Sequence, residues 1–129
     1  MGLPSPDRGF ADRALRQLSG WPALTVCRAA DGTASGLALR THQIVHLHSE
    51  DEAEVLLTPP VVRRMAEALD DCNQVIIEPG GWVRVRLDSA SDVTLFVSLV
   101  SVAIKANTTA PVNTHRAISP CPKAINAAV

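Results

Sequence analysis

The chain has 129 residues, of which 47% are hydrophobic, and its formal net charge is -1 at pH 7. This length suits a single domain with a sizeable core, and the apolar content excludes disorder throughout the chain. The balance of 12 basic and 13 acidic residues disfavours a nucleic acid as partner, because nucleic-acid-binding proteins usually carry a basic excess.

The cysteines and the N-terminal residues bear on where the protein works. Cys27, Cys72 and Cys121 are odd in number and form no CxxC pair, so they indicate neither a disulfide framework nor a zinc ribbon. Reduced thiols are typical of cytosolic proteins. The first residues, MGLPSPDRGFADR, carry charge early and lack an apolar run, so no signal peptide is predicted. We therefore expect a cytoplasmic protein with reduced cysteines.

In chain order, the first predicted element is a helix that ends near Gly20. Ser5 is a suitable N-cap, and the proline after it fits the first helical position. Gly9 weakens the first turn and offers a later start. Apolar residues then recur at helical spacing up to the glycine, where the run stops.

Four short strands follow, at residues 24–28, 37–41, 44–48 and 54–58. An Asp-Gly pair favours a hairpin between the first two. A tight reversal near His42 and Gln43 then leads into the third strand, on which Ile44, His46 and His48 share one face. Two aligned histidines, rather than three, are therefore expected on this strand.

A second helix and a second hairpin occupy the middle of the chain. Residues 58–73 have apolar positions at helical spacing, with Thr58 as the cap and prolines in the first turn. Residues 74–78 and 81–87 flank Pro-Gly-Gly and read as a hairpin. Successive side chains of its second strand alternate between two faces, with Trp82, Arg84 and Arg86 on one and Val83, Val85 and Leu87 on the other.

The last predicted helix covers residues 90–105, with Ser89 and Asp92 as its capping box. Its apolar stretch of about 12 residues is shorter than the ~17–25 needed to cross a bilayer, so we expect a buried helix and no membrane partner. Residues 107–129 contain three prolines and no periodicity, which indicates a flexible tail behind a single domain of residues 1–106. The order α-β-β-β-β-α-β-β-α predicts an α+β fold, an antiparallel sheet of about six strands packed by three helices.

Three segments resemble the luciferase-domain family over about residues 13–106: GWPALTV, IVHLHSEDEAEVLLTPPVVRRM and GGWVRVRLDSASDVTLFVSLVSVAIKA. The family pattern has W-P before a strand, H-L-H before acidic residues, and G-W-V before a helix that begins D-V. The matching positions are Trp21, Pro22, His46, Leu47, His48, Gly81, Trp82, Val83, Asp92 and Val93. The family includes small actinobacterial proteins that share a domain with the fungal luciferase. Many relatives carry a histidine where this chain has Ile76, Ile77 and Glu78.

The resemblance implies a chemistry. The fungal member oxygenates a hydroxypyrone luciferin without a metal or an added cofactor, so we expect no cofactor and no metal ligand here. The expected activity is binding of a small aromatic or anionic molecule, with cofactor-independent oxygenation or proton transfer. His46 and His48 are the expected catalytic base and orienting group, and the expected substrate contacts are Trp82, Arg84 and Arg86.

The residues themselves leave other interpretations open. Two histidines at i and i+2 can bind a metal if an acidic neighbour adds a ligand, for which the candidates are Glu50, Asp51, Glu52 and Glu78. The histidines could equally line a half-exposed sheet face, with Trp82 packed under a helix and the arginines paired to Glu50, Asp51, Glu52 or Glu54. The alternative function is a non-catalytic protein-interaction module or a homodimer, joined through a sheet edge or through the Val-rich last helix.

Overall fold

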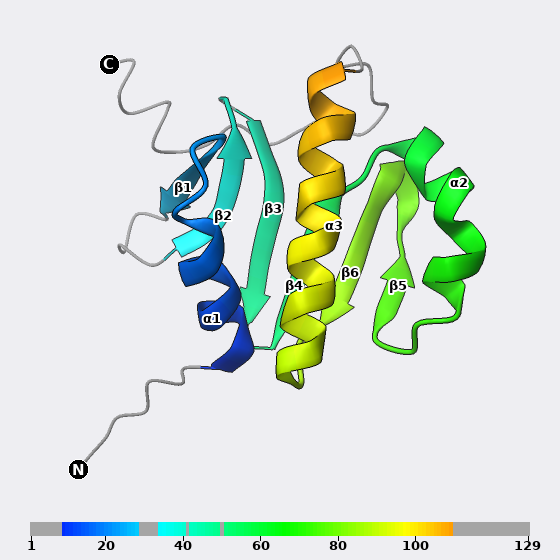
Figure 1. The fold of residues 1–129 in the computed structure, drawn as a ribbon, viewed down its shortest axis with the longest axis horizontal. Coiled ribbons are helices and arrows are strands. Elements are labelled where there is room, and N and C mark those ends of the chain that lie inside the picture. Colours follow the sequence, from blue (N-terminus) through cyan, green and yellow to red (C-terminus); the bar gives the residue numbers. More distant parts are fainter. Residues whose placement is uncertain (1–8, 29–33, 41, 50, 110–129) are drawn as a thin grey trace.

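The computed structural model describes residues 9–28, 34–40, 42–49 and 51–109 (Figure 1). It confirms the predicted α+β class and the predicted element order. The elements are α1 (Gly9–Leu18), β1 (Leu24–Arg28), β2 (Ala34–Leu39), β3 (His42–Ser49), β4 (Glu52–Leu56), α2 (Pro59–Asp70), β5 (Val75–Ile77), the 3-10 turn η1 (Pro79–Gly81), β6 (Trp82–Arg86) and α3 (Ala90–Thr109).

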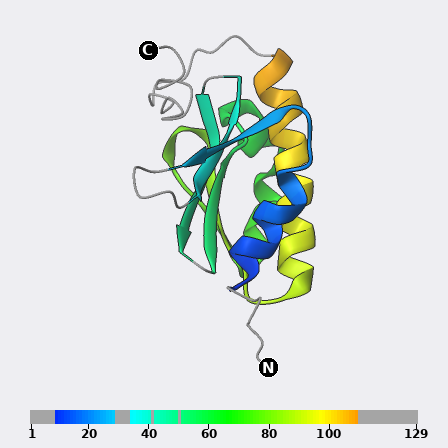
Figure 2. The same cartoon turned by 90° about the vertical axis from the view of Figure 1, so that its left-hand side faces the viewer.

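One six-stranded sheet, with strand order β1-β2-β3-β4-β6-β5 and antiparallel pairing throughout, forms the body of the fold. Helices α1 and α3 pack against each other and lie on the same side of the sheet, as Figure 2 shows. Helix α2 packs against β5 and η1, beside the far edge of the sheet (Figure 1). The other face of the central strands therefore has no cover from α1 or α3.

Strand alternation separates a valine row from a polar row. Val45, Val55 and Val83 lie opposite one another across β3, β4 and β6, and all three are fully buried. Since α3 packs on β4 and β6, this row faces the helices. On β6, the buried Val85 and the half-buried Arg84 follow the alternation predicted for that strand.

The start of β3 corrects one prediction. The strand begins at His42, so the reversal does not fall on His42 and Gln43. It falls just before them, where Arg40 has φ 63, in the left-handed region that suits a tight turn. Within β3, Ala38 pairs with Gln43 but Leu37 pairs with Val45, so a bulge interrupts the alternation at Ile44. Gln43 therefore lies on the same face of the sheet as His46. The prediction that Ile44 shares this face is wrong.

The C-terminal helix is longer than predicted. It ends at Thr109, four residues beyond the expected end, because residues of the predicted tail take part in packing. The side-chain amide of Asn107 donates to the carbonyl oxygens of Leu56 on β4 and Ala103, at 2.9 and 2.7 Å. The rest of the predicted tail, residues 110–129, lies outside the described residues.

Length and composition alone would allow α3 to cross a membrane, because residues 90–108 form one apolar helix of 19 residues. The same helix supplies buried side chains to the core, including Phe96 and Val100, each with no exposed area. A core helix passes the same test of length and composition, so the burial agrees with the helix packing predicted from the sequence.

The predicted cap of α3 is confirmed, with one difference. The backbone N–H of Asp92 donates to Ser89 Oγ at 3.3 Å, as a capping box requires. The carboxylate of Asp92 accepts instead from the backbone N–H of Asp88 and from the side chain of Gln74, each at 2.9 Å. The cap therefore also ties α3 to the segment that enters β5.

The expectation of reduced cysteines is wrong for Cys27, which is disulfide-bonded. Cys72 is a free thiol. Cys121, the Ser5 cap and Glu50 lie outside the described residues.

Candidate functional site

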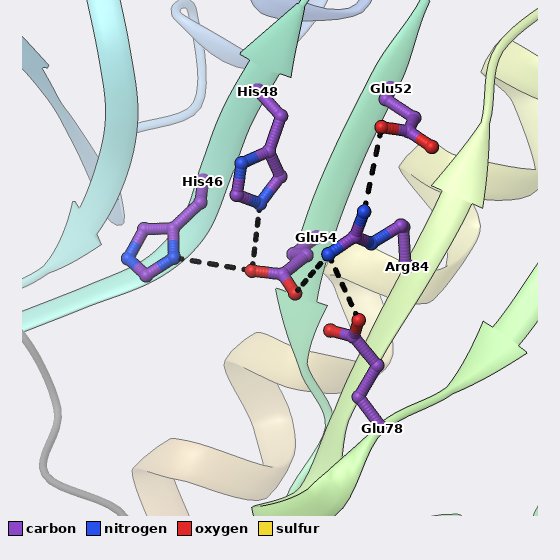
Figure 3. Close-up of polar contacts among 6 residues, drawn as sticks. All are labelled: His46, His48, Glu52, Glu54, Glu78 and Arg84. Atoms are coloured by element: carbon purple, nitrogen blue, oxygen red, sulfur yellow. Dashed lines mark ion pairs between the residues drawn. The ribbon is translucent and has the colours of Figure 1, made fainter.

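A polar cluster crosses β3, β4 and β6 on the face turned away from α1 and α3. His46 on β3 lies opposite Glu54 on β4, and Glu54 lies opposite Arg84 on β6. Figure 3 shows the side chains of this row meeting above the strands, joined by His48 and Glu78. The sheet register therefore gathers groups that are up to 38 residues apart in the chain, from His46 to Arg84.

Glu54 is the centre of the cluster. Its side chain is only 4% exposed, and one oxygen, Oε1, lies 2.9 Å from His48 Nε2 and 3.5 Å from His46 Nδ1. Its other oxygen, Oε2, lies 3.7 Å from Arg84 Nη2. The carboxylate is thus flanked by two imidazoles on one side and a guanidinium on the other.

The surroundings of Glu54 keep it ionised. Burial alone would raise the pKa of its carboxyl group, because a charged form is poorly solvated there. A hydrogen bond with Glu78, hydrogen bonds with His48 and His46, and the charge of His48 together outweigh that effect and lower the pKa from 4.5 to about 2. At neutral pH, Glu54 therefore acts as a hydrogen-bond acceptor and a negative charge rather than as a proton donor.

A bulge explains why both histidines reach the same carboxylate. Leu47 pairs with Ala53 and Ser49 pairs with Glu52, so His48 is an extra residue in β3. A bulge of this kind re-aims a side chain relative to regular pairing. In a regular ladder His48 would lie opposite residue 52, whereas here its ring contacts Glu54.

His46 is held by an aromatic partner as well. Its ring stacks on Trp82, with centroids 4.6 Å apart and planes 17° apart. Trp82 is 1% exposed, so the indole forms a buried platform beneath the imidazole. The ring of His48 meets that of His46 edge-on, with centroids 6.3 Å apart. The two imidazoles therefore have defined and different orientations.

Arg84 joins the cluster to two further carboxylates. Its Nη1 lies 3.6 Å from Glu52, and its Nη2 lies 3.0 Å from Glu78. Pairing of this arginine with Glu52 and Glu54 was one of the interpretations left open by the sequence. Three acidic side chains surround a single guanidinium, so the cluster is net negative even if Glu54 and Glu78 share one proton in their hydrogen bond.

Four of the five predicted site residues lie in the cluster: His46, His48, Trp82 and Arg84. Arg86 does not contact it through any ion pair among the described residues; its side chain is 65% exposed and lies 3.8 Å from Asp88. Sequence reasoning missed Glu54 as the residue on which the histidines converge. The only available signal was its position on the strand after the histidines, which does not reveal a register.

The cluster also has the composition of a metal site. One donor atom from each of His46, His48 and Glu54 lies within 4.8 Å of the others. Two imidazoles and one carboxylate form a common ligand set for zinc and for non-haem iron. Glu54, rather than one of the acidic residues considered from the sequence, lies where a third ligand would be needed.

Residues 41–103 match the family model of the luciferase domain. This match supports membership of the luciferase-domain family. The matched segment includes every residue of the polar cluster, from His46 to Arg84. Neither the curated proteins nor the solved structures contain a match to this chain. The function of this protein therefore has to be argued from its own site.

Proposed function

We propose that this luciferase domain binds a small aromatic molecule above the polar cluster and removes a proton from it, with His48 as the base. The observation that carries this proposal is the convergence of His46 and His48 on the ionised Glu54. A carboxylate that orients an imidazole is a recurring arrangement for general base catalysis.

The tautomer of His48 follows from its partner. An ionised carboxylate can only accept hydrogen bonds, so His48 Nε2, at 2.9 Å from Glu54, carries the proton. In the neutral ring, Nδ1 then has the free lone pair. The His48 side chain is 40% exposed, so a bound molecule can reach the ring.

His46 and Trp82 serve as the orienting part of the site. His46 is 22% exposed and stacks on the indole, so it can present one ring face or edge to a bound molecule. Trp82 was expected to contact the substrate, but it is only 1% exposed, so its role in this proposal is to support His46. Arg84 positions Glu54 in the same indirect way.

Of the two substrate classes expected from the sequence, the charges favour a neutral aromatic molecule over an anion. The guanidinium of Arg84 is already surrounded by Glu52, Glu54 and Glu78. An added anion would meet a net negative cluster and lose favourable solvation. Arg86, the other candidate for an anion contact, lies beyond this cluster beside Asp88.

Proton removal is also the first step of the oxygenation that the family resemblance implies. Loss of a proton from an acidic C–H or O–H group leaves an electron-rich anion, which can react with molecular oxygen without an added cofactor. The base, the orienting ring and the fixed carboxylate are the groups that this step requires from the protein.

The test is exchange of an acidic ring proton for deuterium by metal-free protein, followed by NMR in deuterated buffer. A hydroxypyrone and a neutral hydroxylated aromatic of similar size are the probes. We expect the wild type to accelerate exchange, His48→Ala to abolish the acceleration, and His42→Ala, an exposed histidine of the same strand, to retain it. Equal exchange in the wild type and His48→Ala would show that His48 is not the base.

A second candidate function, self-association, has one observation in its favour. Strand β5 is an edge of the sheet, and its Ile76 and Ile77 are 57% and 40% exposed. An exposed apolar edge strand can pair with a second copy. The apolar face of α3 is already packed in the core, so β5 is the better candidate for the contact. Sedimentation of the wild type and Ile76→Lys at increasing concentration tests it, since a monomer at the highest concentration contradicts the dimer.

A further inference from the structure

We propose that His46, His48 and Glu54 form a binding site for one divalent transition-metal ion, of the zinc or iron(II) class. The proposed ligand atoms are His46 Nδ1, His48 Nε2 and Glu54 Oε1, and Oε1 lies 3.5 and 2.9 Å from the two nitrogens. This site departs from the metal-free chemistry that the family resemblance implies, and it does not depend on the identity of the substrate.

The spacing of the three atoms suits a shared ion. Ligand atoms about 2.0–2.1 Å from zinc lie about 3.3 Å apart in a tetrahedral arrangement and about 2.9 Å apart at right angles. The observed separations from Glu54 Oε1 are 2.9 Å to His48 and 3.5 Å to His46. One donor atom of each residue lies within 4.8 Å of the others, so the two imidazoles would rotate toward each other to share one ion.

The supporting residues hold the ligands as a metal site requires. His46 and Glu54 are direct cross-strand partners, and the bulge in β3 turns His48 toward the same point. Trp82 fixes the His46 ring from below, and Arg84 contacts the oxygen of Glu54 that is not a proposed ligand. Such outer contacts orient metal ligands and are a regular part of metal sites.

The local charge also favours a cation. Three carboxyl groups and one guanidinium make the cluster net negative while both imidazoles are neutral. A divalent ion would offset this charge and would replace the proton between His48 and Glu54. The metal and that proton are therefore alternative occupants of the same position.

Two imidazoles and one carboxylate leave coordination positions open for water or substrate. His48, the most exposed ligand at 40%, marks the side from which solvent can reach them. When bound, the metal would supply a Lewis acid or a water of lowered pKa at this position. His48 would then be a ligand, and it would no longer be available as the base.

The experiment uses the full-length, tag-free protein, freed of metal with a chelator and then titrated with zinc or cobalt(II). Metal content, calorimetry and the absorption of bound cobalt report binding without any assay of activity. Glu54→Gln and His48→Ala remove one ligand each. Asp88→Asn and His42→Ala are the matched controls, because Asp88 pairs with Arg86 outside the cluster and His42 lies on the same strand as the two histidines but is not a ligand.

We expect one equivalent of metal in the wild type and in both controls, and an affinity at least tenfold weaker in Glu54→Gln and His48→Ala. The NMR signals of His46 and His48 should shift on zinc addition, while those of His42 should not. The NMR measurement keeps the test independent of whether a variant folds. Absence of binding to the wild type, or binding unchanged in Glu54→Gln and His48→Ala, would overturn the site. Either result leaves the proton-exchange test unaffected, because that test is done on metal-free protein.

Discussion

The imidazole of His46 lies almost parallel to the indole of Trp82, with ring centroids 4.6 Å apart. The contact joins β3 to β6 across β4, and it places a half-buried polar ring on a fully buried apolar one. Because the same His46 ring also turns Nδ1 toward Glu54, the stack fixes the geometry of the whole cluster.

The stack should contribute measurably to stability. His46→Ala and His46→Phe both remove the contact with Glu54, but only the phenylalanine retains an aromatic ring over Trp82. We expect the alanine variant to be less stable than the phenylalanine variant by about 1 kcal/mol, the usual strength of an aromatic pair. Denaturant unfolding measures the difference, and equal free energies of unfolding would show that the stack is not stabilising.

Glu54 should matter far more to stability than Glu52, although both contact Arg84 from the same strand. The Glu54 side chain is 4% exposed, whereas that of Glu52 is 33% exposed. Glu54→Gln should lower the free energy of unfolding by about 1–3 kcal/mol, and Glu52→Gln by no more than about 0.5 kcal/mol. Similar losses in the two variants would contradict a central role for Glu54.

The low pKa of Glu54 makes stability depend on pH in a defined direction. Its folded-state pKa of about 2 lies below the ordinary value of 4.5, so its contribution is complete above pH 4.5 and is lost as the pH falls toward 2. The shift corresponds to about 3 kcal/mol. Metal-free wild type should therefore lose more stability than Glu54→Gln between pH 5 and the acid limit, about pH 2. If the unfolding free energies of the wild type and of Glu54→Gln fall in parallel as the pH is lowered, Glu54 does not cause the pH dependence.

Gly81 should not tolerate a side chain. Its φ is +89, and a Cβ there would lie 2.5 Å from the carbonyl carbon of Thr58. Gly81→Ala combines backbone strain with a clash against main chain, for an expected loss of about 2–4 kcal/mol. The control is Gly20→Ala, since a Cβ at Gly20 meets nothing within 4 Å. That change should alter stability by less than about 0.5 kcal/mol.

Asn107 should behave as part of the folded domain. Its side chain links α3 to the end of β4 through the bond to Leu56, so Asn107→Ala should cost about 1–2 kcal/mol. Thr108→Ala is the control, because among the described residues the Thr108 hydroxyl donates within the helix, to the carbonyl oxygen of Ile104. Alanine has the higher helix propensity, so that variant should be neutral or slightly stabilised. If Asn107→Ala leaves the thermal unfolding temperature unchanged, residue 107 belongs to the tail, as first predicted.

The sequence by itself determined the fold class, the order of the elements and the alternation along β6. These follow from local patterns, namely the apolar periods of helices and strands and the turn residues between them. The same local information placed Trp82 and Arg84 on one face and named His46 and His48 as candidates. The predicted turn at His42 was wrong, because the chain reverses at Arg40 and β3 already begins at His42.

The tertiary structure alone decided which residues make the site. Glu54 became its centre because β4 pairs with β3 on one side and with β6 on the other, and because His48 is bulged. The same pairing left Arg86 outside the cluster, near Asp88, and brought Glu78 into it. Register and bulges depend on contacts between distant segments, and a shift of one residue moves a side chain to the other face of the sheet. No local pattern in the chain carries that information.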